Sequence, residues 1–223
     1  MDIVEVLPRL RMLRFPVGAA YLWRDGRELT LIDTGTADCA AEIEEALDGE
    51  LRRIVLTHWH EDHTGSAAAL AARHGAEVVA HRLDAPVIRG HVAGAPAVLE
   101  EFEIPIRAAL PPLPPAAPCR VDREVEQGEV LEFGGGAVVV GVPGHTDGSI
   151  ALHLPETRVL FTGDAVANVG RTMLGVFNTD RAKAVKSLHR LADLAVETVL
   201  FGHGDPIVHG AAFALRRAAS AAE

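Results

Sequence analysis

The chain has little of what several classes of protein need. It contains two cysteines among 223 residues, too few for a disulfide framework, so we expect reduced thiols and a cytoplasmic location. No apolar run reaches the roughly 18 residues that a membrane-spanning helix requires. The first 15 residues mix Asp2, Glu5 and Arg9 with apolar side chains and lack the apolar centre of a signal peptide. The sequence therefore predicts a soluble protein without a membrane partner.

Positive charge is also scarce. Lysine and arginine total 21 against 31 acidic residues, which gives a formal net charge of −10. Binding to a phosphate backbone relies on basic surface, so we expect no nucleic-acid partner and a small-molecule substrate instead. The hydrophobic content of 48% and the charged content of 23% are ordinary for a globular protein. A chain of this length suits one α/β domain, which we predict to span residues 1–223.

The densest group of polar residues lies between an apolar run and an alanine-rich segment. Four potential metal ligands occur within six residues, namely His58, His60, Asp62 and His63. Arg53 to Leu56 before them is typical of a buried strand, and Ser66 to His74 after them is typical of a helix. Imidazole and carboxylate together suit zinc, iron or manganese. The alternative is a solvated loop, and the downstream part of the chain helps to decide between the two.

Three further polar residues each follow an apolar run and have glycine beside them. They are His145, Asp164 and His203, which come after the runs Val138 to Val142, Val159 to Phe161 and Thr198 to Phe201. Glycine lets the backbone turn sharply and approach a ligand closely. One such histidine would be interpreted as a turn residue. Three such positions downstream of the first group favour a shared metal site.

These residues carry a resemblance to a known family. Asp33-Thr34-Gly35, the segment Thr57 to Gly65, His145, Asp164 and His203 occur in the order of the five motifs of the metallo-β-lactamase-fold hydrolase superfamily, which the chain resembles over nearly its whole length. The resemblance implies an α/β fold, an αβ/βα sandwich of two mixed sheets with outer helices.

The resemblance also implies a ligand set. Residues matching His58, His60 and His145 hold a first metal ion in this family. Those matching Asp62, His63 and His203 hold a second, and the carboxylate matching Asp164 bridges both. Asp33 corresponds to a residue that steadies the ligand loop, as metal ligands generally need.

The chemistry that such a site supports is hydrolysis. Two divalent ions, most simply Zn²⁺ with iron or manganese as alternatives, would share a water and lower its pKa toward neutrality. The resulting hydroxide would attack a carbonyl or phosphoryl centre. Asp62 and Asp164 would orient it and are the predicted catalytic residues. We expect a hydrolase of a small ester-like, thioester or lactone substrate.

Other functions stay open. Persulfide dioxygenases of the same superfamily resemble this ligand set but use one iron, and the superfamily includes nucleases and phosphodiesterases; a non-catalytic metal-binding protein is a further alternative. Asp164 stands where zinc β-lactamases commonly use cysteine. Glyoxalase II carries a C-terminal helical domain, and only 20 residues follow His203 here. Lactonases of the superfamily place a tyrosine near the bridging aspartate, whereas the only tyrosine here is Tyr21.

The pattern of the remaining chain predicts two similar halves, the second beginning near Val121. A helix capped by Thr36 is expected over Ala37 to Leu47. Gly134-Gly135-Gly136 is expected to form a hairpin turn. The predicted strands and the other helices are Ile3–Val6, Ala19–Trp23, Leu29–Ile32, Glu77–Ala80, Val130–Phe133, Ala137–Val142, Ile150–His153, Arg181–Asp193 and Ala211–Ala219.

Between the halves, Ala93 to Pro118 carries seven prolines, a density that we expect to preclude a regular helix or central strand. This insert is either a surface linker, a wall over the metal cleft, or a contact in a homodimer. The loop Ala165 to Thr179 is a second candidate wall. Its Arg171 could bind a substrate carboxylate or phosphate or could simply be solvated. Trp59, between two ligands, either lines the cleft or packs.

Overall fold

A computed structural model describes residues 1–222. Its first sheet has seven strands in sequence order. Strands β1 to β4 are antiparallel neighbours, and β4 to β7 are parallel neighbours. The strands are β1 (Asp2–Leu7), β2 (Leu10–Arg14), β3 (Ala19–Asp25), β4 (Glu28–Ile32), β5 (Glu50–Val55), β6 (Glu77–His81) and β7 (Arg123–Val125).

The second sheet has five strands in the order β14-β11-β10-β9-β8. They are β8 (Val130–Leu131), β9 (Ala137–Gly141), β10 (Ile150–Leu154), β11 (Val159–Phe161) and β14 (Thr198–Leu200). A separate hairpin pairs β12 (Val166–Asn168) with β13 (Thr172–Leu174). It follows directly after a 3₁₀ turn, Gly163–Ala165, at the end of β11.

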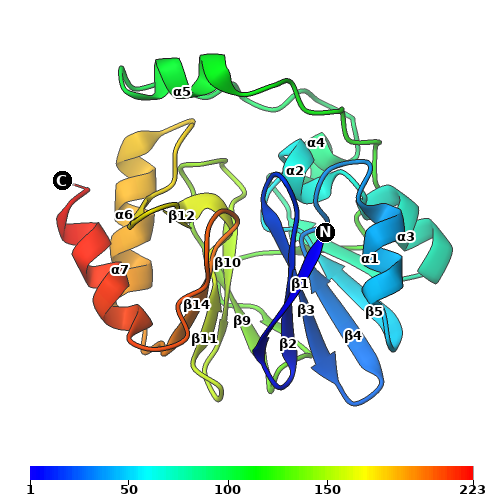
Figure 1. The fold of residues 1–223 in the computed structure, drawn as a ribbon. Helices are drawn as coiled ribbons and strands as arrows, with labels where there is room; N and C mark the ends of the chain where they lie inside the picture. The colour runs from blue at the N-terminus through cyan, green and yellow to red at the C-terminus, as the bar shows by residue number, and fades with distance from the viewer. Residues whose placement is uncertain (223) are drawn as a thin grey trace.

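Helices cover the outer faces of both sheets (Figure 1). Helices α1 (Ala40–Ala46) and α3 (Ala67–His74) lie outside the first sheet, and α6 (Arg181–Ala192) and α7 (Ala211–Ser220) lie outside the second. The short helices α2 (Glu61–Thr64), α4 (Ala85–Ile88) and α5 (Glu103–Ala109) lie near the upper edge. This confirms the predicted αβ/βα sandwich. None of the helices among residues 1–222 is long and apolar enough to cross a membrane.

Strand β3 shows why the two sheets pack as they do. Successive side chains of a strand point to opposite faces. Tyr21 and Trp23 accordingly lie in the core between the sheets, with Phe161 of the second sheet, whereas Ala20 and Leu22 lie in the core beneath α1 and α3. A third core joins the second sheet to α6 and α7. A strand buried on both faces appears in sequence as an uninterrupted apolar run, as this one does.

Two predicted boundaries are wrong. Helix α1 begins at Ala40, three residues later than predicted, because the Thr36 hydroxyl contacts the side chain of Asp38 instead of capping a helix. The second half begins at β8, since β7 pairs with β6 and completes the first sheet. Strand β2 and the hairpin β12–β13 were not predicted. The predicted glycine turn is present: residues 134–136 have positive φ and join the antiparallel strands β8 and β9.

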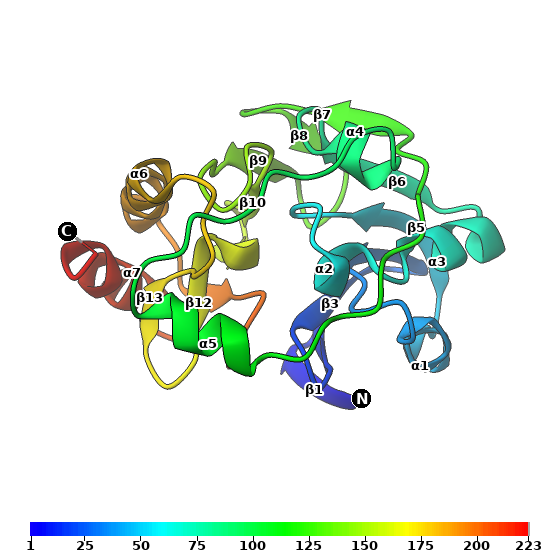
Figure 2. The same ribbon diagram turned by 90° about the horizontal axis from the view of Figure 1, so that it is seen from above.

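The proline-rich insert crosses the top of the molecule. Seen from above, it runs from α4 past β10 to the side of β12 and β13, forms α5 there, and returns past α2 to β7 (Figure 2). The presence of α5 contradicts the expectation that proline would preclude a helix here. Pro105 is the third residue of α5, in the first turn, where a backbone N–H has no helical partner to lose.

Candidate metal centre

All seven predicted ligands meet at the upper edge between the sheets. His58, His60, Asp62 and His63 come from the loop after β5 and from α2; His145 follows β9, Asp164 lies in the 3₁₀ turn after β11, and His203 follows β14. Each therefore leaves the end of a strand whose position is fixed by a buried sheet. A rigid scaffold of this kind can hold separate loops in one arrangement.

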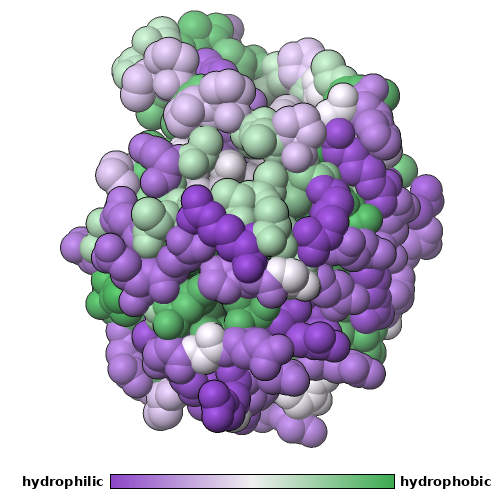
Figure 3. All heavy atoms as spheres, turned by 90° about the vertical axis from the view of Figure 1, so that its right-hand side faces the viewer, coloured by the Kyte–Doolittle hydropathy of each residue, from purple (hydrophilic) through white to green (hydrophobic). Residues whose placement is uncertain are grey.

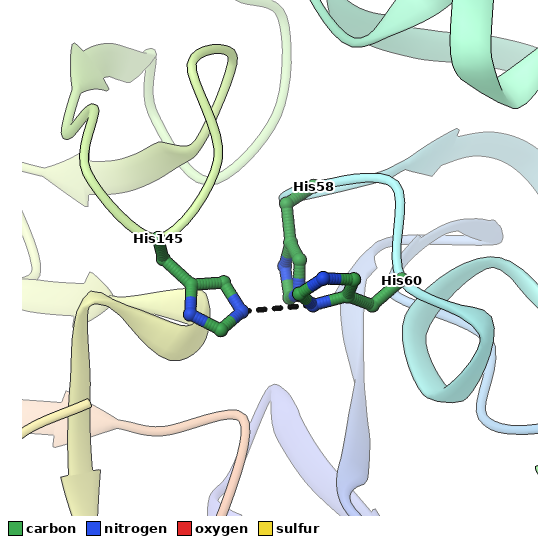
Figure 4. A group of neighbouring side chains, drawn as sticks. All are labelled: His58, His60 and His145. Atoms are coloured by element: carbon green, nitrogen blue, oxygen red, sulfur yellow. Dashed lines mark hydrogen bonds between the residues drawn. The ribbon is translucent and has the colours of Figure 1, made fainter. Parts of the chain in front are cut away.

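Three histidines form the first group, and their rings converge in Figure 4. His60 Nδ1 lies 3.0 Å from His58 Nε2 and 2.9 Å from His145 Nε2. Burial, followed by repulsion from the neighbouring imidazole of His145, lowers the pKa of His60 to about 3. Burial also lowers the pKa of His58 and of His145. Neutral imidazoles with converging nitrogens are suited to a transition-metal ion.

Carboxylates join histidines in the second group. His203 Nε2 lies 3.2 Å from Asp62 Oδ2 and 3.3 Å from Asp164 Oδ2. The charge of Asp164 raises the pKa of His203 to about 10. Burial by itself would raise the pKa of Asp62, but His63 and His203 outweigh it and lower the pKa to about 2. The group thus stabilises positive charge at its centre.

Asp164 lies between the two groups and gives an indication that a cation belongs there. Its Oδ2 is 3.6 Å from His145 Nε2 of the first group, and its Oδ1 is 3.3 Å from His63 Nε2 of the second. Asp164 Oδ1 and His63 Nε2 are nevertheless buried without a hydrogen-bond partner. Buried polar atoms are rarely left unpaired in folded proteins. Two unpaired atoms that face each other in this way are arranged as the ligands of a metal ion would be.

Asp33 holds the ligand loop in place. Its Oδ1 accepts a hydrogen bond from Thr57 N, and its Oδ2 accepts one from the Thr57 hydroxyl and contacts His63 Nδ1, each at 2.8 Å. When Nδ1 of His63 carries the proton that Asp33 binds, Nε2 keeps a free lone pair directed at the centre. Thr57 also lies 3.0 Å from His58 Nδ1, so one carboxylate orients two ligands.

Asp84 was not predicted and connects two ligand loops. Its carboxylate accepts hydrogen bonds from the backbone N–H of Trp59 at 3.1 Å, from the hydroxyl of Thr146 at 2.7 Å, and from the N–H of Gly148 at 2.9 Å. Burial raises its pKa to about 6. One signal was available in the sequence: like the ligands, Asp84 comes shortly after the end of a strand at the same edge of the sheet.

Glu103 is the second residue that the sequence did not reveal. It belongs to α5 and is only 1% exposed. Its Oε1 accepts a hydrogen bond from Phe177 N at 2.9 Å. The neighbouring carbonyl of Val176 lies 3.1 Å from His145 Nδ1 and can accept its proton. The proline-rich insert is thereby linked through the loop 175–179 to one of the metal-site histidines.

Two more contacts fix the insert above the site. Val98 N donates to Asn178 O at 2.9 Å. A Cβ atom added at Gly94 would lie 2.2 Å from the indole ring of Trp59, so the insert packs on this ring where only glycine fits. Trp59 therefore packs between the core and the insert. The insert is therefore packed in a defined position over the loops that carry the predicted ligands.

Tyr21 and Arg171 lie elsewhere than at the cluster of ligands. The Tyr21 hydroxyl is buried and donates a hydrogen bond to Phe201 O at 2.7 Å, so it supports the backbone two residues before His203. Arg171 is exposed at the tip of the β12–β13 hairpin and lines a separate cavity.

Comparison with known proteins agrees with this geometry. Residues 13–203 match the family model of the metallo-beta-lactamase superfamily. The chain belongs to this superfamily. A metallo-beta-lactamase family protein from Thermus thermophilus has the same fold, with a TM-score of 0.69 and 27% identity, covering 97% of this chain and 78% of its own.

Relatives in the superfamily carry hydrolase names. The chain is 32% identical to a hydroxyacylglutathione hydrolase of Rhodobacter capsulatus over 82% of this chain and 61% of that protein. It is 31% identical to the "Probable metallo-hydrolase YflN" of Bacillus subtilis over 71% of this chain and 66% of that protein. The chain spans about three fifths of the length of the hydroxyacylglutathione hydrolases that it matches.

Proposed function

We propose that the protein is a metal-dependent hydrolase of a small thioester, with esters and lactones as the next substrate classes to test. The observation that carries the proposal is the meeting of seven donor residues in two groups with Asp164 between them. Such a set suits two divalent cations, and its nitrogen and carboxylate donors favour Zn²⁺ over calcium or copper(I).

Divalent cations held there would supply a water of lowered pKa as the nucleophile. The residues of the chain do the rest. Asp62 and Asp164 orient the water and accept its proton. The three histidines His58, His60 and His145 stay neutral and bind through lone pairs. Asp33 and the carbonyl of Val176 keep His63 and His145 in the required tautomers.

Two further features support a small substrate and a thioester. The insert packs over the ligand loops, which suits a small substrate better than a polymer, and the net charge of −10 opposes binding of a nucleic acid. Relatives named hydroxyacylglutathione hydrolase match most of this chain. Since they are longer than this chain, the thioester assignment rests on a direct assay.

The test combines metal analysis with a substrate panel. We expect about two metal ions per chain and hydrolysis of a hydroxyacylglutathione or a related thioester, followed through release of the thiol. Asp164→Ala should lose both metal and turnover. Asp193→Ala, which removes an exposed carboxylate at the end of α6, should retain both.

Different outcomes would replace the proposal. One iron per chain, with oxygen uptake on glutathione persulfide, would indicate a persulfide dioxygenase. Cleavage of bis(p-nitrophenyl) phosphate or RNA in preference to every thioester, ester and lactone would indicate a phosphodiesterase. Full activity of the Asp164→Ala variant would rule out the proposed bridging role.

A further inference from the structure

A cavity of about 620 Å³ lies beside the metal centre and contains none of the seven ligands. It is open to solvent on one side and is lined by the segment leading into α5, the hairpin β12–β13, the beginning of α6, and α7. Its volume falls within the range of roughly 300–1,000 Å³ that is usual for small-molecule sites.

The charge of the cavity is opposite to that of the chain. Three arginines line it, Arg171, Arg181 and Arg217, and no aspartate or glutamate is among its lining residues within 1–222. The whole chain has ten more acidic than basic side chains. Within residues 1–222, the ion pair of these arginines is a loose one, with Glu100 Oε1 at 3.9 Å from Arg181 Nε. Arg217 lies over the ring of Phe213 at 5.9 Å. The guanidinium groups remain able to bind an anion.

Apolar side chains form most of the remaining lining, together with the polar Asn168 and Thr172. Phe102, Met173, Leu174 and Phe213 contribute to it, and Phe102 and Phe213 are 49% and 62% exposed. Figure 3, which faces the side of α1 and α3, shows apolar side chains interspersed with polar ones on the lobe at the top of the molecule, where the insert lies. Aromatic rings exposed beside arginines offer an apolar contact and a charged contact to the same ligand.

The cavity adjoins the metal centre through the hairpin. Strand β12 follows directly after the turn that carries Asp164. The N–H of Asn168, which lines the cavity, donates to the carbonyl of His203 at 3.0 Å. The hairpin thus separates the cavity from the metal ligands by one layer of backbone.

We propose that this cavity binds an anionic, partly apolar small molecule, with a carboxylate or phosphate held by Arg171 and Arg217 and an aliphatic or aromatic portion against Phe102 and Phe213. Guanidinium groups bind both anions through paired hydrogen bonds. The ligand is either the distal part of the substrate, which rests on the proposed hydrolase function, or a separate molecule of the same chemistry. The experiment distinguishes the two.

Calorimetric titration of the metal-loaded protein tests binding directly. The probes are octyl phosphate and octanoate below their micelle concentrations, with octanol and octyltrimethylammonium as neutral and cationic controls. We expect saturable 1:1 binding of the two anions only. Arg171→Gln and Arg217→Gln should each weaken it about tenfold or more, since a hydrogen bond to a charged group contributes about 1.5–3 kcal/mol.

Matched variants guard against indirect effects. Arg52→Gln removes the same group from an exposed position on β5 and should leave affinity unchanged. Phe102→Ser removes a half-exposed aromatic ring from the lining, and it should weaken the binding of both anions alike. Absence of saturable binding, equal binding of octanol, or equal affinity in the arginine variants would overturn the proposal.

Thioesterase kinetics assign the ligand. If it is part of the substrate, the arginine variants raise KM at constant kcat, and octyl phosphate competes with substrate. If it is a separate molecule, these variants lose octyl phosphate binding while KM is unchanged. Should no thioester be hydrolysed by any of these proteins, the proposed function fails, whereas the titration still reports on the cavity.

Discussion

Replacing Glu103 by alanine should loosen the attachment of the insert to the loop 175–179 beside the metal centre. The Glu103 carboxylate is buried, and it accepts one hydrogen bond from outside the insert, from Phe177 N, and one from inside it, from Glu100 N, each at 2.9 Å. The alanine variant would lose the first, which fastens α5 to the loop 175–179, and the second, which supports the beginning of α5.

The size of the effect follows from the first hydrogen bond. A hydrogen bond to a charged group contributes about 1.5–3 kcal/mol, and each 1.4 kcal/mol corresponds to a factor of ten in an equilibrium. Opening of the insert should therefore become about 10- to 100-fold more frequent. The contacts of Val98 with Asn178 and of Gly94 with Trp59 remain. The free energy of global unfolding should therefore fall by no more than the contribution of this hydrogen bond, at most about 3 kcal/mol.

Trypsin offers a clean assay, because Arg107 is the only lysine or arginine between Arg89 and Arg120. Cleavage after Arg107 requires α5 to open, and its rate follows the open population when opening and closing are fast. Glu103→Ala should be cut there 10- to 100-fold faster than wild type. Glu103→Gln, which keeps an acceptor without the charge, should be intermediate.

Glu101→Ala is the matched control, since Glu101 is an exposed neighbour of the same segment. Its cleavage rate should equal that of wild type. If Glu103→Ala and Glu101→Ala were cut at the same rate, the Glu103 carboxylate would not be what holds the insert down.

Three further changes probe the centre itself. Asp33→Ala should lower metal affinity about 10- to 100-fold, because both Thr57 and His63 lose their partner; chelator competition measures this, and an unchanged affinity would contradict the role of Asp33. Gly202→Ala should lose metal by elemental analysis, since its Cβ would lie 1.9 Å from Asp164 Oδ1, and normal metal content would show that the loop can move away. Asp84→Asn should gain stability relative to wild type as pH rises from about 4 to 7, as measured by denaturant melts. Burial raises the pKa of Asp84 to about 6, so its carboxyl contributes stability at low pH that is lost as the group ionises. A stability difference independent of pH would contradict this.

The meeting of the seven predicted ligands could be expected because these residues are local in sequence or follow strand ends. His58 to His63 occupy one loop, and His145, Asp164 and His203 each come after an apolar run that forms a buried strand. The parallel and antiparallel pairing of these strands brings their ends to the same edge. The seven residues therefore needed no knowledge of tertiary packing beyond the two-sheet arrangement.

The roles of Asp84 and Glu103 could not be predicted in the same way, although Asp84 also follows a strand end. Each acts through backbone groups of loops that are distant in sequence, and a backbone N–H leaves no trace in the residue types. The same holds for β7, whose place in the first sheet depends on pairing with β6 and not on its own short pattern. Proline content alone does not reveal helix α5, because Pro105 lies in its first turn, where proline is compatible with a helix.

The two sheets each provide part of the metal centre, with His58 and His60 from the first and His145, Asp164 and His203 from the second. A metal ion bound there would link the two sheets through its ligands, and the unfolded chain would not bind it in this way. Ligand linkage then adds about 4.1 kcal/mol to the free energy of unfolding when free metal exceeds its dissociation constant a thousandfold. That increment is a large share of the roughly 5–15 kcal/mol typical of a domain. The concentration of free metal would thus influence what fraction of the protein molecules is degraded by proteases, independently of the presence of substrate.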